Sequence, residues 1–139
     1  MGLFDFMKVC LFSEINGVVT LDGKPVAGAE IVRTAIFKDK PRIDKAITDE
    51  AGKFHFDAMY GHSLGKLINM FEMVIPQTMT IHYHNHEFLG WRTSKRDYHE
   101  NAELDSDRDI TLSCDLSNEP SLKDQQYGRP VRGVCDIHE

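Results

Sequence analysis

Three histidines alternate with other residues in the stretch His82-Tyr83-His84-Asn85-His86. On a continuous strand, side chains two positions apart point to the same face, so the three imidazoles could together bind zinc or copper. Asn85 is typical of turns, and a chain reversal there would instead leave His82 on a strand and His84 and His86 at an exposed tip. The sequence therefore leaves two interpretations open: a metal site at His82, His84 and His86, or a hairpin tip without one.

A second group of residues suits the recognition of another protein. Trp91 is the one tryptophan of the chain and stands beside Arg92, and both residue types are enriched in protein interfaces. Strand alternation places Leu89 and Trp91 on one face and Phe88 and Arg92 on the other, so one pair is exposed and one is in the core. An acidic run follows, which would steer a basic partner. The candidate contact residues are Trp91, Arg92, Tyr98, Glu100, Glu103 and Asp105. The alternatives are that Trp91 fills the core and that the acidic run is a solvated loop.

No pattern typical of nucleophilic catalysis stands in the sequence. The chain has no Gly-x-Ser-x-Gly elbow, and the cysteines Cys10, Cys114 and Cys135 lack the spacing of metal ligands. An odd cysteine count without a secretory signal favours reduced, mostly buried thiols over disulfides. The sequence therefore predicts no catalytic residue and no cofactor.

Short strands separated by turn signals must position all of these residues. Asp22-Gly23 is a strong hairpin signal because glycine accepts the positive φ of a primed turn, and Asp49 to Gly52 forms a second turn. Residues 67–75 fit a short helical turn that leads into a strand. We expect about seven strands, at residues 15–21, 29–37, 43–48, 54–59, 78–84, 87–93 and 109–116.

Alternation along these strands also predicts the core and the domain limits. We expect a lead-in segment at 1–14, a sandwich domain at 15–116 and a polar C-terminal extension at 117–139. The expected core consists of Val19, Leu21, Ile31 or Val32, Ile47, Phe54, Phe56, Ile81 and Leu112.

Two motifs carry a family resemblance. The first is Gly17-Val18-Val19 followed by Asp22-Gly23-Lys24-Pro25-Val26-Ala27-Gly28-Ala29, and the second is Thr48-Asp49-Glu50-Ala51-Gly52-Lys53-Phe54-His55-Phe56. Together they resemble the carboxypeptidase-regulatory-like, or transthyretin-like (prealbumin), β-sandwich family, and the whole chain is similar to small bacterial stand-alone members. The resemblance implies an all-β, antiparallel, Ig-like sandwich. The motifs of the hydroxyisourate hydrolase branch of that fold do not carry over, since no histidine precedes His55.

Composition narrows the possible partners. The formal net charge is −6, from 22 acidic and 16 basic residues, which argues against nucleic acid and anionic membranes. No apolar run approaches the ~20 residues that a membrane span needs. The first residues lack the basic region and cleavage site of a secretory signal, so we expect a cytoplasmic protein.

Three functional hypotheses remain. The resemblance implies an accessory module that binds another protein, and a cytoplasmic acidic version would suit an immunity or accessory protein for a basic antibacterial toxin of a secretion system. The second hypothesis is a metal or small-ligand carrier that uses His82, His84 and His86. The third is a hydrolase or toxin effector.

Overall fold

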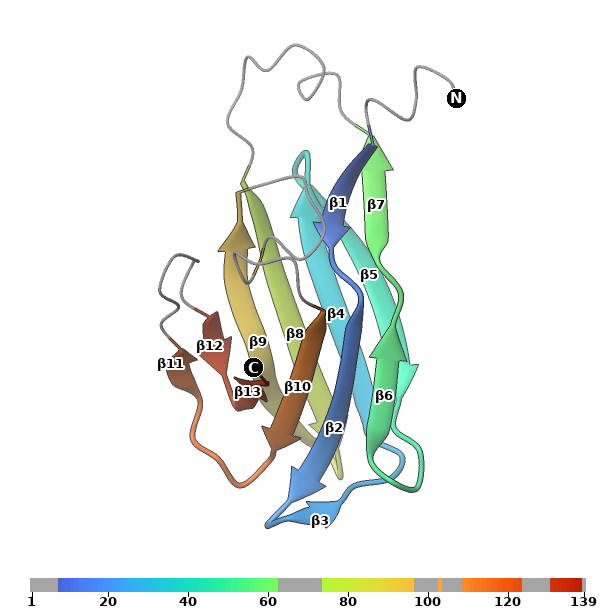
Figure 1. The fold of residues 1–139 in the computed structure, drawn as a ribbon, viewed down its shortest axis with the longest axis vertical. Helices are drawn as coiled ribbons and strands as arrows, with labels where there is room; N and C mark the ends of the chain where they lie inside the picture. The colour runs from blue at the N-terminus through green and yellow to red at the C-terminus, as the bar shows by residue number, and fades with distance from the viewer. Residues whose placement is uncertain (1–7, 63–73, 97–102, 104–108, 124–130, 139) are drawn as a thin grey trace.

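The computed structural model describes residues 8–62, 74–96, 103, 109–123 and 131–138. Thirteen strands stand in these residues (Figure 1). In chain order they are β1 (Lys8–Phe12), β2 (Ile15–Leu21), β3 (Lys24–Pro25), β4 (Glu30–Phe37), β5 (Lys40–Ile47), β6 (Lys53–Phe56), β7 (Met59–His62), β8 (Ile75–Tyr83), β9 (His86–Lys95), β10 (Ile110–Asp115), β11 (Ser121–Lys123), β12 (Val131–Gly133) and β13 (Cys135–Ile137). None of the described residues belongs to a helix that could cross a membrane.

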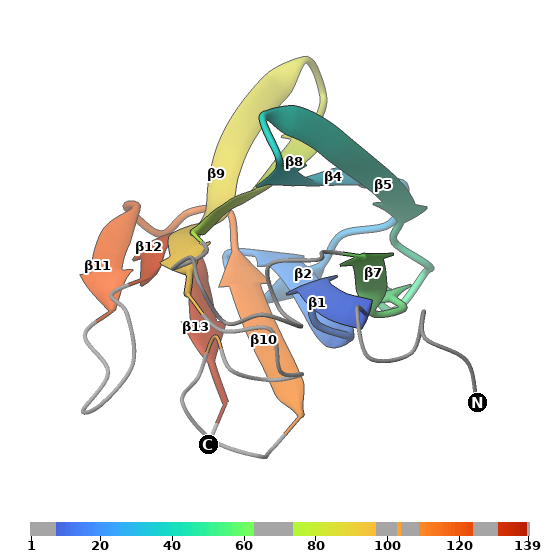
Figure 2. The same ribbon diagram turned by 90° about the horizontal axis from the view of Figure 1, so that it is seen from above.

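The strands form two layers, as Figure 2 shows from above. In one layer, β13, β10, β2 and β3 pair in that order, β6 pairs with the other side of β2, and the β1–β7 pair extends this layer. The facing layer is a six-stranded sheet in the order β11-β12-β9-β8-β4-β5. The β2–β10 pairing is parallel. The predicted all-β sandwich is confirmed.

The structure has more strands than the predicted seven because several short ones were not recognised. β3, β11, β12 and β13 are two or three residues long, too short for an alternating pattern to reveal. The stretch for which a helical turn was predicted, 67–75, lies mostly outside the described residues, and β8 begins at Ile75.

The predicted turn at Asp22-Gly23 is confirmed by the backbone. Asp22 and Gly23 have φ values of 52° and 81°, the left-handed conformation that a two-residue primed turn requires. The turn is also attached to a distant strand, because the backbone amide of Gly23 donates to Oδ2 of Asp115 at 2.9 Å. The hairpin of β2 and β3 is thereby attached to the end of β10.

The core agrees with the predicted alternation except at two positions. Val19, Ile31, Phe54, Phe56, Ile81 and Leu112 are all buried. Leu21 and Ile47 are instead 39% and 67% exposed. Leu21 is the last residue of β2, beside the turn, and Ile47 lies on edge strand β5 with its side chain on the solvent side of the sheet. The prediction that these two residues are buried is therefore wrong.

One irregularity reverses the faces predicted for β9. Met79 pairs with Trp91 but Thr80 pairs with Leu89, so Gly90 is an extra residue in the ladder. A bulge of one residue exchanges the faces of the side chains that follow it. Phe88 and Trp91 consequently both face the core, while Leu89 and Arg92 face outward, which corrects the predicted pairing of Leu89 with Trp91.

Described segments on both sides of the predicted sandwich domain take part in the layers. Val9, Leu11 and Phe12 of β1 are fully buried, so the predicted lead-in segment contributes to the core. β12 pairs with β9 in one layer, and β13 pairs with β10 in the other. The segment predicted as a polar C-terminal extension therefore contributes strands to both sheets.

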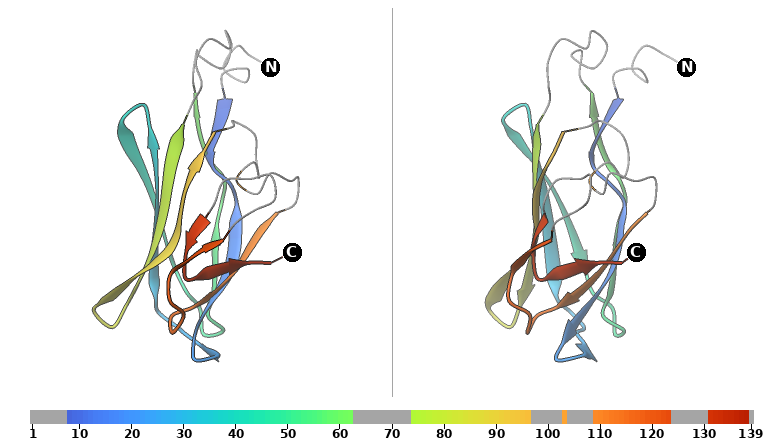
Figure 3. Two further views of the ribbon diagram at one scale, coloured as in Figure 1. Left: turned by 90° about the vertical axis from the view of Figure 1, so that its left-hand side faces the viewer. Right: turned by 60° about the vertical axis from the view of Figure 1, so that its left-hand side comes forward.

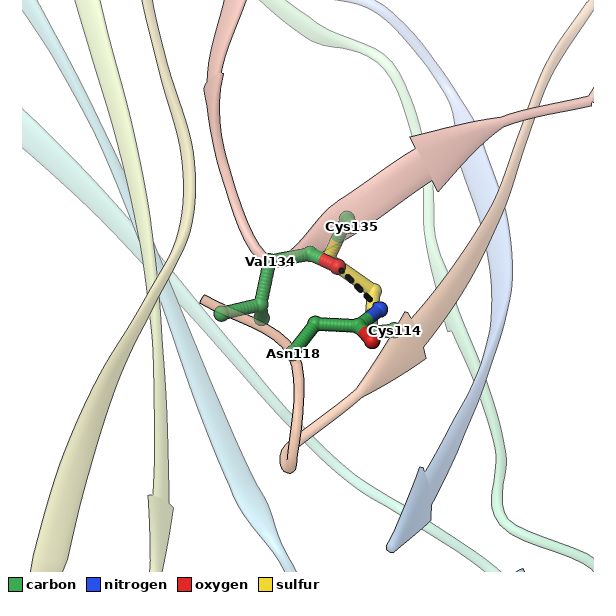
Figure 4. The surroundings of a disulfide bond; sticks show 4 residues. All are labelled: Cys114, Asn118, Val134 and Cys135. Carbon is green, nitrogen blue, oxygen red and sulfur yellow. Dashed lines mark hydrogen bonds between the residues drawn. A yellow bond between two sulfur atoms is a disulfide. The ribbon is translucent and has the colours of Figure 1, made fainter. Parts of the chain in front are cut away.

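The prediction of three reduced thiols is wrong in this structure. Cys114 and Cys135 form a disulfide, with sulfur atoms 2.02 Å apart (Figure 4), and Cys10 is a buried free cysteine. The two half-cystines face each other directly in the antiparallel pairing of β10 with β13. β13 was not predicted from the sequence, so the strand pairing that places these two cysteines opposite each other was not predicted either. Beside the disulfide, Nδ2 of Asn118 donates to the carbonyl of Val134 at 3.5 Å.

Candidate functional site

The three histidines of the predicted metal site lie around the turn between β8 and β9. His84 and Asn85 have φ values of 49° and 62°, the backbone of a two-residue primed hairpin turn. Across this turn Tyr83 pairs with His86. His86 therefore shares the face of Tyr83, whereas His82, one position earlier on β8, points to the opposite face.

This reversal decides between the two interpretations of the histidine stretch. The hairpin tip is the correct one, and His84 and His86 are exposed there. In the part of the chain that the structure describes, His82, His84 and His86 do not bring three donor atoms within reach of one ion. The interpretation of His82, His84 and His86 as a zinc or copper site is therefore wrong for the described structure.

A different set of donors comes together where β2 and β6 pair. Glu14, His55 and Asp57 each offer a ligand atom, and these atoms lie within 4.8 Å of one another. Nδ1 of His55 lies 2.7 Å from Oδ1 of Asn16, and Nε2 lies 2.8 Å from Oδ1 of Asp57. Both ring nitrogens thus already have partners, so an ion would have to displace one of them to bind the ring. His55 is exposed, and the pairing of β2 with β6 brings Asn16 next to it.

Trp91 is buried and does not form part of a surface. It is 0% exposed, its Nε1 donates to Oε1 of Gln77 at 3.1 Å, and its ring centroid lies 6.3 Å from that of Phe12. The prediction that Trp91 contacts a partner is therefore wrong, and its alternative, a core tryptophan, is correct. Arg92 is exposed on the outward side of β9 and remains a candidate contact residue.

Glu103 is likewise buried, at 3% exposure. Its carboxylate accepts hydrogen bonds from the backbone amide of Ser13 at 2.9 Å and from the Ser13 hydroxyl at 2.7 Å. Nε2 of Gln77 donates to it at 3.2 Å, and Nζ of Lys95 lies 3.2 Å away. Glu103 therefore binds groups of its own chain, which corrects its predicted role in partner binding. Tyr98, Glu100 and Asp105 lie outside the described residues.

Around Glu103, the interior contains residue types that can act as nucleophiles. Sγ of Cys10 lies 3.7 Å from Oγ of Ser13, and Nζ of Lys95 donates to the carbonyl of Cys10 at 3.0 Å. Burial raises the pKa of the Cys10 thiol, which disfavours the reactive thiolate. Since Cys10, Ser13, Lys95 and Glu103 are at most 3% exposed, the arrangement stabilises the fold rather than meeting a substrate.

Arg33 joins the two layers from the middle of β4. Its guanidinium forms an ion pair with Asp44 of β5 at 2.8 Å and donates to the carbonyl of Ser13 at 2.8 Å. The same group lies 4.8 Å from the ring centroid of Phe12 and 4.6 Å from that of Phe56. Burial lowers the pKa of Arg33. These contacts hold the edge of the six-stranded sheet, at β4 and β5, in a fixed position over the other layer.

The outward side of that sheet, which we call the outer face, is not covered by any other described strand (Figure 2 and Figure 3). It consists of the outward side chains of β5, β4, β8 and β9. Three isoleucines on it are exposed: Ile36 at 41%, Ile43 at 56% and Ile47 at 67%. Val32 of β4 and Leu89 of β9 also face this side and are half-buried. An apolar cluster of this kind on a sheet surface marks an interaction site more often than a single exposed side chain does.

The register of the strands arranges the outer face in rows. An acidic row contains Ile47, Glu30, His82 and Glu87. A middle row contains Lys45, Val32, Thr80 and Leu89. A basic row contains Ile43, Thr34, Thr78, Arg92 and Arg132. On the four strands of the outer face, the negative charges are Glu30 and Glu87, near the β8–β9 turn. The positive charges are Lys45 in the middle row and Arg92, which follows Glu87 by five residues on β9.

The outer face is also bordered by a free strand edge. β5 is the last strand of its sheet, so one side of its backbone does not pair with another described strand. Lys40, Arg42 and Lys45 provide positive charge along this edge, a feature that keeps edge strands of soluble proteins from pairing indiscriminately. The outer face, rather than the β5 edge, is the better candidate for a specific contact.

Comparison with known proteins gives one match. The sequence model of a family described as "Domain of unknown function (DUF6795)" matches residues 15–119. No curated protein and no solved structure matches the chain.

Proposed function

The chain belongs to the DUF6795 family of unknown function, and we propose that it is a non-enzymatic protein-binding module that docks through its outer face. The observation that supports this most directly is the exposure of Ile36, Ile43 and Ile47 on one side of one sheet. Arg33 supports it further, because its ion pair with Asp44 fixes β4 and β5 in place. A face held in one geometry loses little conformational entropy on binding.

The exposed isoleucines can supply a useful share of a binding free energy. Burying a whole isoleucine side chain contributes roughly 1.5–3 kcal/mol. Scaled by their exposed fractions of 41%, 56% and 67%, the three would contribute roughly 2–5 kcal/mol. Charged residues on the face would mainly orient the partner and raise the rate of association, and would add less to the affinity.

Two arguments support a protein as the partner: the charge of the chain, and the proposed resemblance to transthyretin-like accessory modules. The net charge of −6 over the whole chain favours the approach of a basic protein, and on the outer face itself Glu30 and Glu87 are the groups that such a protein would contact. An immunity or accessory protein for an antibacterial toxin fits that preference. The predicted cytoplasmic location would require Cys114 and Cys135 to be reduced there, unlike in this structure, where they form a disulfide. Among the predicted contact residues that the structure describes, Arg92 has its side chain on the outer face.

The test uses purified wild-type protein and two matched variants as baits in extract from the native cells. Ile43→Asp places a charge in the outer face, and Leu21→Asp places the same charge at another exposed apolar residue, 39% exposed, in the other layer. We expect one protein to be captured by the wild type and by Leu21→Asp, and to be lost with Ile43→Asp. That protein is then purified and its binding measured by calorimetry. Equal binding of all three baits would refute docking through the outer face.

The donor group at Glu14, His55 and Asp57 favours a second candidate function, binding of a divalent metal ion such as zinc. The three donor atoms lie within 4.8 Å of one another, and one histidine with two carboxylates is a ligand set that zinc accepts. Calorimetric titration with zinc chloride tests it, with His55→Ala as the disabling variant and His84→Ala as the control. Equal heats for the wild type and His55→Ala would end this candidate.

A further inference from the structure

We propose that the folded chain forms a covalent bond within its own core, an amide that joins Nζ of Lys95 to the side-chain carbonyl of Gln77 with release of ammonia. This inference goes beyond the proposed function, because it concerns the buried residues around Glu103 and not the outer face. The observation that carries it is that one carboxylate, that of Glu103, contacts both the amine and the amide that would react. The substrate is the chain itself, so the burial of these groups does not prevent the reaction.

Glu103 holds the two reacting nitrogen atoms on its two oxygen atoms. Nζ of Lys95 lies 3.2 Å from Oε1, and Nε2 of Gln77 donates to Oε2 at 3.2 Å. The same two nitrogens also donate to consecutive carbonyls of β1, Nζ to that of Cys10 at 3.0 Å and Nε2 to that of Leu11 at 2.9 Å. Two independent sets of contacts thus hold the amine and the amide in one place.

The strand register places the two side chains on one face of the β8–β9 ladder. Gln77 pairs with Thr93, and Lys95 follows Thr93 by two positions, so Gln77 and Lys95 are diagonal neighbours. All three side chains are buried. Diagonal neighbours lie about 7–8 Å apart, a distance that a lysine and a glutamine side chain can span once they are joined. The bond therefore requires no change in the strand pairing.

Gln77 is the better electrophile of the two side-chain carbonyl groups near Lys95. Nε1 of Trp91 donates to Oε1 of Gln77 at 3.1 Å, so an N–H group already points at the oxygen that becomes negative when an amine attacks the carbonyl carbon. A donor at that position stabilises the tetrahedral intermediate. The carboxyl carbon of Glu103 belongs to an anion instead, which repels the electron pair of a nucleophile.

Glu103 can carry the protons that the exchange requires. It first takes one proton from the Lys95 ammonium, which frees the electron pair of Nζ to attack Cδ of Gln77. The bond from Nζ to Cδ forms, and the bond from Cδ to Nε2 breaks. Of the three ammonium protons, two pass through Glu103 to the leaving nitrogen and one stays on the new amide. The nitrogen leaves as ammonium, Glu103 is a carboxylate again, and no oxidant or reductant takes part.

Burial favours the new amide once it has formed. The reacting groups and their two neighbours, Trp91 and Glu103, are at most 3% exposed. Water, the competing nucleophile that could hydrolyse the amide, is excluded from such a site. The product also removes the buried positive charge of Lys95, whose desolvation is costly. The ion pair of Lys95 and Glu103 is therefore the state from which the bond forms.

The mass of the intact wild-type protein, measured after reduction and denaturation, tests the proposal. We expect it to be lower by one ammonia than the mass calculated for the purified chain. In a tryptic digest, we expect peptide 67–92, which contains Gln77, to be joined to peptide 93–96, which contains Lys95. Trypsin should also fail to cleave after Lys95, since an amide nitrogen carries no charge. A wild-type mass equal to the calculated one overturns the inference.

Variants assign the roles of the amine and the carboxylate. Lys95→Arg removes the amine and keeps the positive charge, and Glu103→Gln keeps both reacting groups but removes the proton carrier. Both should have their full calculated mass and no joined peptide, while circular dichroism shows whether each is folded. The exposed Glu119→Gln is the matched control and should lose one ammonia as the wild type does. A joined peptide in Glu103→Gln would overturn the role of the carboxylate.

Trp91→Phe tests the hydrogen bond to the carbonyl oxygen. It keeps an aromatic ring in the core and removes the N–H donor. The chain is synthesised in a cell-free extract, and its intact mass is followed over time. We expect the bond to form about a hundredfold more slowly in Trp91→Phe than in the wild type, the effect of one lost donor to an oxyanion. Equal rates would overturn the role of Trp91.

Two other products would overturn the assignment of Gln77. Loss of one water, with peptide 93–96 joined to peptide 97–108, would identify Glu103 as the acceptor. Loss of ammonia without any joined peptide would place the reaction at an asparagine or at another glutamine, and the proposed bond would be refuted. None of these results bears on the outer face, which the capture experiment tests separately.

Discussion

The carboxylate of Glu103 accepts two hydrogen bonds from Ser13, 90 residues earlier in the chain, one from the backbone amide at 2.9 Å and one from the hydroxyl at 2.7 Å. Lys95 lies 3.2 Å from the same carboxylate. Both charged side chains are fully buried, so the positive charge of Lys95 and the negative charge of Glu103 compensate each other.

We expect Glu103→Gln to destabilise the protein by about 3–5 kcal/mol, because it leaves the Lys95 ammonium buried without its counter-charge. Urea unfolding at pH 7 measures this, with the exposed Glu119→Gln as the control. The double variant Glu103→Gln, Lys95→Met should recover much of the loss, since it removes both buried charges. A loss for Glu103→Gln no larger than that of the control would contradict the buried ion pair.

Asp115 should make stability depend on pH in the acid range. Its pKa lies well below the usual carboxyl range because Ser117 donates to it from both hydroxyl and backbone and Gly23 donates from its backbone. A lowered folded pKa stabilises the fold above the unfolded pKa of about 4. That contribution is lost as the pH falls from there toward the folded value.

We therefore expect Asp115→Asn to be less stable than the wild type at pH 6, with the difference shrinking between about pH 4 and pH 2. Urea unfolding at a series of pH values measures the difference, with exposed Asp109→Asn as the control. A gap between wild type and Asp115→Asn that stays constant down to pH 2 would contradict the assigned hydrogen bonds.

Gly23→Val should cost about 1–3 kcal/mol. An added Cβ at Gly23 meets no atom within 4 Å, so the cost comes from the positive φ of 81° alone. Gly23→Asn, which accepts this conformation more readily, should cost less than half as much. Thermal unfolding of both variants measures the two costs, and equal costs would mean that something other than backbone conformation is responsible.

Because Cys114 and Cys135 are bonded to each other, we expect one free thiol in the protein before reduction. Titration of the unfolded, non-reduced protein should count Cys10 alone, and titration after reduction should count three cysteines. Reduction should lower the free energy of unfolding by about 2–4 kcal/mol, because the bond closes a loop of 21 residues in the unfolded chain. Three thiols before reduction would show instead that the protein is made and kept in a reducing compartment.

Patterns local to one strand or one turn were determined by the sequence. The alternation of Phe54 and Phe56 with His55 placed both rings in the core, and Asp22-Gly23 indicated the primed turn that their φ values confirm. The same local logic at Asn85 indicated the reversal that separates His82 from His86. These features depend on sterics and on period-two geometry, which are properties of a few neighbouring residues.

Features that join distant segments were decided by the tertiary structure. One extra residue at Gly90 turned Trp91 inward and Arg92 outward, and the docking of Glu103 on Ser13 buried a carboxylate that charge alone placed at the surface. The position of β5 at the sheet edge left Ile47 exposed. Register, edge position and long-range pairing arise from the packing of whole sheets. For that reason the outer face and its two charged rows became visible only in the folded chain.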